Sequence, residues 1–239
     1  MNSSDAIRDK VAIVTGASRG IGFAIARKLA GMGAKVSVCA RDSQALERAA
    51  SELRDQGANV LAAAADVTRA GDLESLVKKT EESLGPVEIL VNNAGIGYFT
   101  PIQDASEAQW DATLDTNLKA VFLLSKLVAP GMIQQRSGQI INIGSLAGKS
   151  AFAGGSIYCA SKWGLLGLTQ CMAEDLRSHG IRVSAICPGS VATEFSPHAG
   201  KNASKMLQPD DVAHAVGTLV TQTPQSFISE ILLRPTQKP

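Results

Sequence analysis

The sequence is poor in aromatic residues and has no excess of charge of one sign. Aromatic side chains make up 4% of its 239 residues, and 23 basic residues balance 22 acidic ones for a formal charge of +1. A near-neutral chain lacks the positive field that would hold a polyphosphate backbone, so nucleic acid is not expected as a partner. Hydrophobic residues reach 45%, which is enough for a large core and excludes an intrinsically disordered chain.

Metal centres, a secretion signal and membrane spans are not expected either. The four cysteines form no C-x-x-C pair, and no nearby histidine completes a zinc pattern, so all four are expected to be buried packing residues. Residues 1–10 are polar and lack the apolar core of a signal peptide. No run approaches the roughly 20 apolar residues of a bilayer span. The sequence therefore predicts a cytoplasmic protein that binds no metal and no membrane.

Short β-branched runs alternate with longer helical patterns along the chain. Strands are expected near residues 11–14, 35–40, 60–65, 87–91, 140–143, 183–186 and 228–233. Helices are expected between them, near residues 21–29, 43–56, 72–84, 107–135, 157–178 and 210–221. A kink or break is expected at Pro130. The alternation predicts one α/β domain over residues 1–239, a doubly wound parallel sheet of six to seven strands with helices on both faces.

A glycine-rich segment, TGASRGIG at residues 15–22, joins the first expected strand to the first expected helix. Gly16 would turn the chain off the strand, Gly20 would let backbone approach a ligand, and Gly22 would let the helix pack on the sheet. The helix N-terminus directs free N–H groups and its positive dipole end at this loop, which suits a pyrophosphate. A purely structural turn is the alternative, because the glycine spacing differs from the commoner G-x-G-x-x-G.

The end of the second expected strand bears on which dinucleotide the loop would bind. An acidic residue there would bind the ribose hydroxyls of NAD, but the position holds Ala40, followed by Arg41. Arg41 and Arg19 of the glycine loop would clamp the 2′-phosphate of NADP through charge-assisted hydrogen bonds. The alternative is that Arg41 is solvated and Asp42, one residue later, binds the ribose of NAD. The two arginines favour NADP.

Tyr158 and Lys162 lie four residues apart on an expected helix, so their side chains would share one face. A tyrosine titrates near pH 10, but a neighbouring ammonium stabilises the phenolate and lowers that pKa. Ser145 follows the fifth expected strand, at the rim where ligands bind in such sheets. Asn117 falls inside the helix before that strand, where an asparagine alone is more often packed or solvated.

Taken in order, these motifs resemble the short-chain dehydrogenase/reductase family over nearly the whole chain. The matching pieces are TGASRGIG, Asp66-Val67, NNAG at 92–95, Asn117, Ser145, Y-x-x-x-K at 158–162 and Pro188-Gly189. The resemblance implies a Rossmann-type sheet, NADP(H) as cofactor, and hydride transfer to or from a small-molecule carbonyl or alcohol substrate. The core motifs and the two arginines are most similar to 3-oxoacyl-(acyl-carrier-protein) reductases, whose thioester substrates are carried by acyl carrier protein or CoA.

The resemblance also implies a role for each residue of the site. Tyr158 would donate a proton to the substrate carbonyl, Ser145 would hydrogen-bond the same oxygen, and Lys162 would bind the nicotinamide ribose and lower the pKa of Tyr158. Asn117 would hold a water that links Lys162 to solvent. The cofactor would contact Gly16, Ser18, Arg19, Gly20, Ile21, Gly22, Arg41, Asp66, Val67, Asn93, Ala94, Gly95, Tyr158, Lys162, Pro188, Gly189, Val191 and Thr193.

The C-terminal part departs from the acyl-carrier-protein reductases. A short stretch at 194–208 replaces their longer helical lid, and residues 228–235 (ISEILLRP) lack their Asn-Gly-Gly ending. Other substrates therefore stay open, namely a sugar, sterol, pterin or diketone, as does a protein that senses NADP without turnover. The resemblance implies a homodimer or homotetramer in which the helices at 107–135 and 157–178 pair across a two-fold axis.

A few residues outside these motifs are further candidates for the site or the interface. Tyr98 and Phe99 follow NNAG and would suit an apolar substrate wall. Trp110 and Trp163 would be anchors of the core or of a subunit interface. His198 lies in the short lid, where no role in catalysis is expected and reach to a substrate is the alternative.

Overall fold

Seven parallel strands form one sheet in the order β3-β2-β1-β4-β5-β6-β7. The structure is a computed structural model that describes residues 6–195 and 202–238. The strands are β1 (Val11–Thr15), β2 (Lys35–Ala40), β3 (Val60–Ala64), β4 (Val87–Asn92), β5 (Gly138–Ile143), β6 (Ile181–Pro188) and β7 (Glu230–Leu233). The strand order reverses between β1 and β4, which is the switch point where ligands bind in such sheets.

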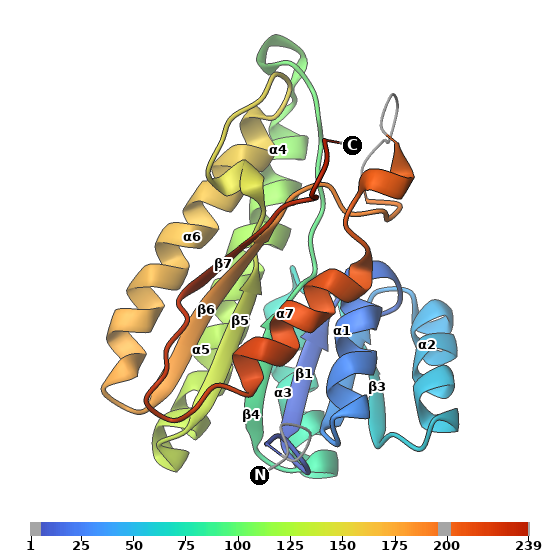
Figure 1. Cartoon of the computed structure of the whole chain (residues 1–239), viewed down its shortest axis with the longest axis vertical. Helices are drawn as coiled ribbons and strands as arrows, with labels where there is room; N and C mark the ends of the chain where they lie inside the picture. Colours follow the sequence, from blue (N-terminus) through green and yellow to red (C-terminus); the bar gives the residue numbers. More distant parts are fainter. Residues whose placement is uncertain (1–5, 196–201, 239) are drawn as a thin grey trace.

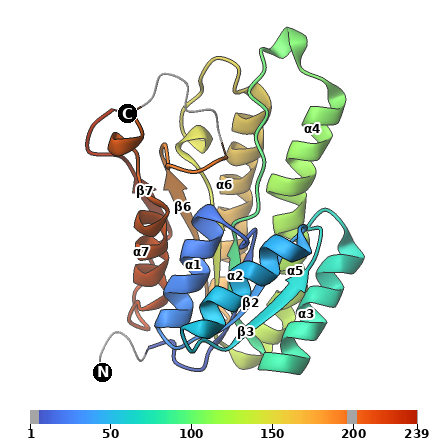
Figure 2. The ribbon, with the colours of Figure 1, turned by 90° about the vertical axis from the view of Figure 1, so that its right-hand side faces the viewer.

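Helices cover both faces of the sheet (Figures 1 and 2). They are α1 (Gly20–Gly31), α2 (Ser43–Asp55), α3 (Ala70–Leu84), α4 (Glu107–Leu114), α5 (Ala120–Gln135), α6 (Ser156–Arg177) and α7 (Pro209–Val220). Short helical turns are η1 (Ile102–Asp104), η2 (Asp115–Lys119), η3 (Leu146–Gly148) and η4 (Ala203–Lys205). In β1, Ala12 and Val14 pack with α1, α2 and α7, whereas Ile13 packs with α3, α5 and α6. A strand buried on both faces is apolar throughout, which is why the continuous runs predicted it.

The doubly wound sheet and the expected elements are confirmed, with element ends shifted by at most two residues. The break expected at Pro130 is wrong, because α5 continues through it to Gln135. Pro130 and Lys126 both lie on the exposed side of α5, so the carbonyl that loses its donor is accessible to water. The irregularity in this stretch is η2, a π-helical turn between α4 and α5.

In the part of the chain that the structure describes, one helical stretch has the length and composition of a membrane span. Residues 107–135 reach a mean hydropathy of 1.2 over an 18-residue window. This finding qualifies the expectation from the sequence that no stretch approaches the length and apolar composition of a bilayer span. Within the fold, α5 packs against β4 and β5, and core helices of soluble proteins pass the same test, so the finding is weak evidence for a membrane.

The cysteines do not all behave as expected. Cys39, Cys159 and Cys187 are buried, but Cys171 is exposed, so the expectation is wrong for this residue. The buried side of α6 includes Thr169 and Ala173, and a residue midway between these two points to the other side of a helix.

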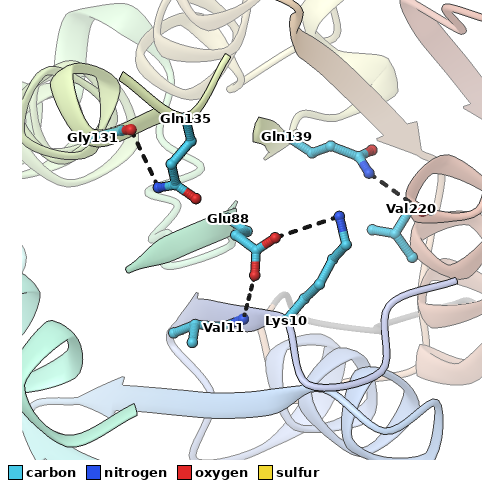
Figure 3. Close-up of polar contacts among 7 residues, drawn as sticks. All are labelled: Lys10, Val11, Glu88, Gly131, Gln135, Gln139 and Val220. Atoms are coloured by element: carbon cyan, nitrogen blue, oxygen red, sulfur yellow. Dashed lines mark hydrogen bonds and ion pairs between the residues drawn. The ribbon is translucent and has the colours of Figure 1, made fainter. Parts of the chain in front are cut away.

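Polar contacts at the amino ends of the strands tie several elements together (Figure 3). Glu88 accepts a hydrogen bond from the backbone N–H of Val11 at 3.4 Å and pairs with Lys10 at 3.5 Å. The Gln139 amide donates to the carbonyl of Val220 at 3.3 Å, which joins β5 to the end of α7. In the last turns of α5, Gln135 donates to the carbonyl of Gly131. The opposite edge, at the carboxyl ends of the strands, holds the candidate site.

Candidate active site

A cleft of about 1230 Å³ opens over the carboxyl ends of the strands. Every residue that the resemblance assigned to the cofactor lines this cleft, from Gly16 at the first strand to Thr193 after the sixth. Ser145 lines it as well, whereas Asn117 does not. No group of three or more metal-binding side chains occurs among the residues that the structure describes.

The glycine loop after β1 has the shape of a phosphate cradle. Gly16 and Gly20 have φ angles of +66° and +57°, a region that favours glycine. A Cβ on Gly16 would lie 2.9 Å from the Cα of Ala94, and a Cβ on Gly22 would collide with the carbonyl of Gly16. In the described part of the chain no side chain caps α1, so the N–H groups of its first turn are open to an anion. The loop therefore fits the diphosphate of a dinucleotide.

Hydrogen bonds hold the NNAG segment against the glycine loop. The Thr15 hydroxyl accepts from the backbone N–H groups of Asn93 and Ala94, each at 3.0 Å. The Asn93 amide donates to the carbonyls of Thr15 at 2.9 Å and Gly16 at 3.2 Å. These bonds fix the distance between β1 and β4 at the switch point. The supporting role of Thr15 was not predicted.

Asp42 is already engaged at the end of the cleft near β2. Its carboxylate accepts from the N–H groups of Gln44 and Ala45, both at 3.0 Å, and so caps α2. The hydrogen bond from Ala45, above all, holds the pKa of Asp42 below its usual value. This cap argues against the alternative in which Asp42 binds the ribose of NAD.

Two arginines line the same end of the cleft. The Arg19 guanidinium pairs with Glu194 at 2.6 Å, and both side chains are 77% exposed. An exposed pair of this kind is worth little, so a phosphate can replace Glu194. Arg41 lies near Asp66. Burial alone would raise the pKa of Asp66, but hydrogen bonds from Thr68 and the positive charge of Arg41 hold that pKa below its usual value. The two guanidinium groups fit a 2′-phosphate.

Ser145, Tyr158 and Lys162 meet at the other end of the cleft. Ser145 follows β5 and accepts from the N–H of Ala147 at 3.1 Å. Its hydroxyl also shares a hydrogen bond with the Tyr158 hydroxyl. Lys162, one turn further along α6, donates to the carbonyl of Ile143 at 2.9 Å, and its Nζ lies 5.8 Å from the centre of the Tyr158 ring. The four-residue spacing thus brings both side chains to the cleft.

The pKa values of this pair differ from the expectation. Burial raises the pKa of Tyr158 to about 12, although the hydrogen bond with Ser145 opposes the shift. Burial also lowers the pKa of Lys162 to about 8. Burial is the largest influence on the pKa of Tyr158 in this structure, and the lowering expected from Lys162 stays a prediction. Desolvation disfavours the charged form of both groups and is the largest cause of both shifts.

Asn117 lies behind the cleft, in the π turn η2, and is fully buried. Its Oδ1 accepts from the N–H of Ile96 at 2.9 Å, and its Nδ2 donates to the Ile96 carbonyl at 2.8 Å and to the Ser161 hydroxyl at 3.0 Å. The side chain therefore joins the segment after NNAG to α6. It does not contact Lys162 directly.

Three phenylalanines surround the Tyr158 side of the cleft. The Phe99 ring packs edge-on to the Tyr158 ring, with 5.4 Å between the ring centres. The ring centre of Phe195 lies 5.8 Å from that of Tyr158, and the ring centre of Phe152 lies 6.0 Å from that of Phe99. All three line the cleft, but Tyr98 does not, so the predicted apolar wall is right for Phe99 alone of that pair. Phe152 and Phe195 come from loops without periodicity, which is why they were not predicted.

The other candidate residues lie elsewhere. Trp110 on α4 and Trp163 on α6 are 42% and 54% exposed, so neither belongs to the core of this chain. His198 lies outside the described residues.

Comparisons with known proteins agree with this geometry. A family model described as short chain dehydrogenase matches residues 10–204. A 3-oxoacyl-[acyl-carrier-protein] reductase of Synechocystis is 38% identical over 234 residues, which are 94% of each chain. A solved metagenomic short-chain oxidoreductase in complex with NADP is 44% identical with a TM-score of 0.87, covering 97% of this chain and 100% of that one.

A second solved structure, the actinorhodin polyketide ketoreductase with NADPH, is 32% identical with a TM-score of 0.88. The match covers 95% of this chain and 96% of that one. NADP(H) is the cofactor that these structures and the arginine-lined cleft support. The chain belongs to the short-chain dehydrogenase family of oxidoreductases.

Proposed function

We propose that this protein is an NADPH-dependent carbonyl reductase in which Tyr158 donates a proton to the substrate oxygen. The observation that carries this proposal is the hydrogen-bonded pair of hydroxyls, Tyr158 and Ser145, on the wall of the cleft. Two such groups can hold one carbonyl oxygen and stabilise the charge that develops on it. Bound NADPH would supply the hydride for the carbonyl carbon.

The protonation state of Tyr158 suits reduction. Because burial raises its pKa to about 12, the phenol keeps its proton across the neutral range and can donate it. The phenolate formed by that transfer lies near the Lys162 ammonium, which stabilises it. The nearby lysine therefore supports the tyrosine after the proton has left.

Once Lys162 has passed a proton to the Tyr158 phenolate, it would regain one through a water held by the π turn. The Asn117 side chain is already engaged with Ile96 and Ser161. A π turn displaces a backbone carbonyl from its usual i+4 donor, and such turns are frequent at functional sites. Asn117 would then act through the backbone of η2, with a water on a freed carbonyl linking Lys162 to solvent.

The substrate that we propose is a 3-oxoacyl thioester carried by acyl carrier protein or CoA, with another small ketone, such as a diketone, as the alternative. The reductase of Synechocystis supports the thioester. The wall of Phe99, Phe152 and Phe195 supports an apolar substrate over a sugar, because buried sugar hydroxyls need polar partners. The short segment 194–208 favours the smaller ketone.

The test is NADPH oxidation by the purified protein with an acetoacetyl thioester and, separately, with a panel of diketones. NADH is run in parallel. Thioester turnover with NADPH supports the first substrate class, and diketone turnover alone supports the second. Binding of NADPH without turnover of any ketone contradicts the reductase proposal and favours a protein that senses NADP.

The proposed assembly is a homodimer or homotetramer built on the outward faces of α4, α5 and α6. Trp110, Phe122 and Trp163 are exposed on these three helices, and together they would form an apolar patch of the kind that marks a contact surface. Light scattering should give a multiple of 24.9 kDa for the wild type, and Phe122→Glu with Trp163→Glu should lower it. A monomeric wild type would contradict this arrangement.

We also keep the cytoplasm as the proposed location, without a membrane or nucleic-acid partner. The balance of 23 basic and 22 acidic residues supports the last point. Cell fractionation tests the location, and recovery of the protein with the membrane fraction would contradict it.

A further inference from the structure

Arg234 extends the cleft beyond the residues that the family motifs assign. It follows β7 directly and lines the cleft. The neighbouring backbone is fixed, because the N–H of Gly189 donates to the carbonyl of Leu233 at 2.9 Å. A Cβ on Gly189 would lie 3.2 Å from both Leu146 and Pro235, so the chain end packs beside the turn that carries Ser145. Figure 1 shows this end of the chain next to the loop after β5.

A second contact holds β7 to that same loop. Lys149 pairs with Glu230 of β7 at 2.9 Å, and Glu230 accepts from the Cys187 thiol at 3.3 Å. The loop after β5 is therefore held to β7, the strand that Arg234 follows, through the pair of Lys149 and Glu230. Arg234 is placed at the catalytic end of the cleft by the fold and not by its own side-chain contacts.

The guanidinium of Arg234 has no hydrogen-bond or ion-pair partner within residues 6–195 and 202–238, and it is exposed. The other cations of the cleft are accounted for. Arg19 pairs with Glu194, Arg41 lies near Asp66, and Lys162 donates to the carbonyl of Ile143.

The acidic residues of the cleft are engaged by groups other than Arg234. Those that line it in the described part of the chain are Asp42, Asp66 and Glu194. Asp42 caps α2 and Asp66 is near Arg41, both at the adenosine end, while Glu194 pairs with Arg19 of the glycine loop. Arg234 is thus an uncompensated positive charge on the wall of the cleft. A fork of N–H donors of this kind matches a carboxylate or a phosphate.

We propose that Arg234 binds an anionic group of the substrate and so makes the reductase selective for anionic ketones. This inference rests on the proposed reductase function and deepens it. The apolar body of the substrate lies against Phe99 and Phe195, and its anion reaches Arg234. The anion is the carboxylate of a small oxo acid or the phosphate of a phosphopantetheine thioester, which share the same recognition chemistry.

The experiment compares matched substrates in Arg234→Gln, Arg234→Lys and the wild type. One arm uses oxo acids and their methyl esters, and the other uses acetoacetyl-pantetheine and acetoacetyl-4′-phosphopantetheine, which differ by one phosphate. Arg177→Gln removes an exposed arginine at the far end of α6 and is the matched control. NADPH affinity should not change in any variant.

The wild type should prefer the anionic member of at least one pair. Arg234→Gln should lower kcat/KM for that member about 10- to 100-fold, mostly through KM, and leave the neutral member within about twofold. Arg234→Lys should restore part of the loss, because it returns the charge without the fork. The arm that responds identifies the carboxylate or the phosphate.

Equal effects on anionic and neutral substrates, or no preference in the wild type, would overturn the inference. If no ketone is reduced at all, the reductase proposal fails, but the role of Arg234 can still be tested by measuring the binding of anionic ligands. Calorimetric titration of the NADP-bound protein with a hydroxy acid and with CoA should then show binding of one of them, weakened in Arg234→Gln. Equal binding to the wild type and Arg234→Gln, or no binding of either ligand to the wild type, would overturn the inference about Arg234.

Discussion

Replacing Lys162 with methionine should change how the stability of the protein depends on pH. The lysine is 5% exposed, and its ammonium donates to the carbonyl of Ile143. Burial lowers its pKa from 10.5 to about 8. Below pH 8 the lysine is charged in both the folded and the unfolded chain, and the folded chain bears the full cost of burying it. Between pH 8 and 10.5 the unfolded chain binds more protons than the folded chain, so the free energy of unfolding rises with pH.

The size of the effect follows from that shift. A fall from 10.5 to about 8 corresponds to about 3 kcal/mol of unfolding free energy that is missing below pH 8. Methionine removes this cost but leaves the Ile143 carbonyl without its donor, which costs about 1–2 kcal/mol. Lys162→Met should therefore be about 1–2 kcal/mol more stable than the wild type at pH 7. The hydrogen-bond loss does not depend on pH, so the advantage of the variant should fall by about 3 kcal/mol towards pH 10.5, where the wild type should be the more stable protein by about 1–2 kcal/mol.

Urea unfolding of the cofactor-free protein from pH 7 to pH 10.5 measures this difference directly. Lys79→Met, which removes an exposed lysine of α3, is the control and should give a difference that does not vary with pH. Lys162→Met should lose turnover even where it gains stability. Parallel stability curves for wild type and Lys162→Met, or a difference that grows with pH, would refute the burial argument.

Three further changes test other parts of the account. Arg41→Ala should raise the Kd for NADPH about 10-fold and leave that for NADH within about twofold, measured by fluorescence titration; equal changes for both would contradict the role of Arg41 at the 2′-phosphate. Asn117→Ala should lower the unfolding free energy by about 2–4 kcal/mol, because buried polar groups of Ile96 and the Ser161 hydroxyl lose their partner. A loss below about 0.5 kcal/mol in a urea titration would argue against that network. Cys171 should be alkylated by iodoacetamide at pH 8, whereas Cys187, which is buried with a pKa raised to about 12, should not. Peptide mass mapping with Cys171→Ser as control checks this, and modification of Cys187 in the native protein would contradict it.

The fold was predictable because the burial of parallel strands and amphipathic helices requires apolar residues in a recognisable pattern along the sequence. Val11–Thr15 is apolar almost throughout, since its side chains alternate between two covered faces. Some helix ends were predictable because glycine readily adopts the positive φ that is common just after a helix. Gly57, which follows α2, has a φ of +85°. Pro130 misled because the expectation ignored which side of the helix it occupies. On an exposed side, the carbonyl without a donor can bond to water.

The candidate site was predictable where residue identity carries the chemistry, and not where packing does. Tyr158 and Lys162 could be placed together from their spacing, but their pKa values depend on burial that no local pattern reports. Phe152, Phe195 and Arg234 reach the cleft from loops and from the chain end. Their positions follow from how these segments fold back over the sheet, and the spacing of residues in the chain does not contain that information.

The most direct test of the central claim is NADPH oxidation by Tyr158→Phe beside the wild type, with NADPH binding measured on the same samples. The change removes one hydroxyl and keeps the ring that packs against Phe99 and Phe195. Cofactor affinity should stay within about twofold, while turnover of the best ketone should fall by about 10³-fold or more, since the proton donor is gone. A variant that keeps more than a few per cent of wild-type turnover would contradict Tyr158 as the proton donor.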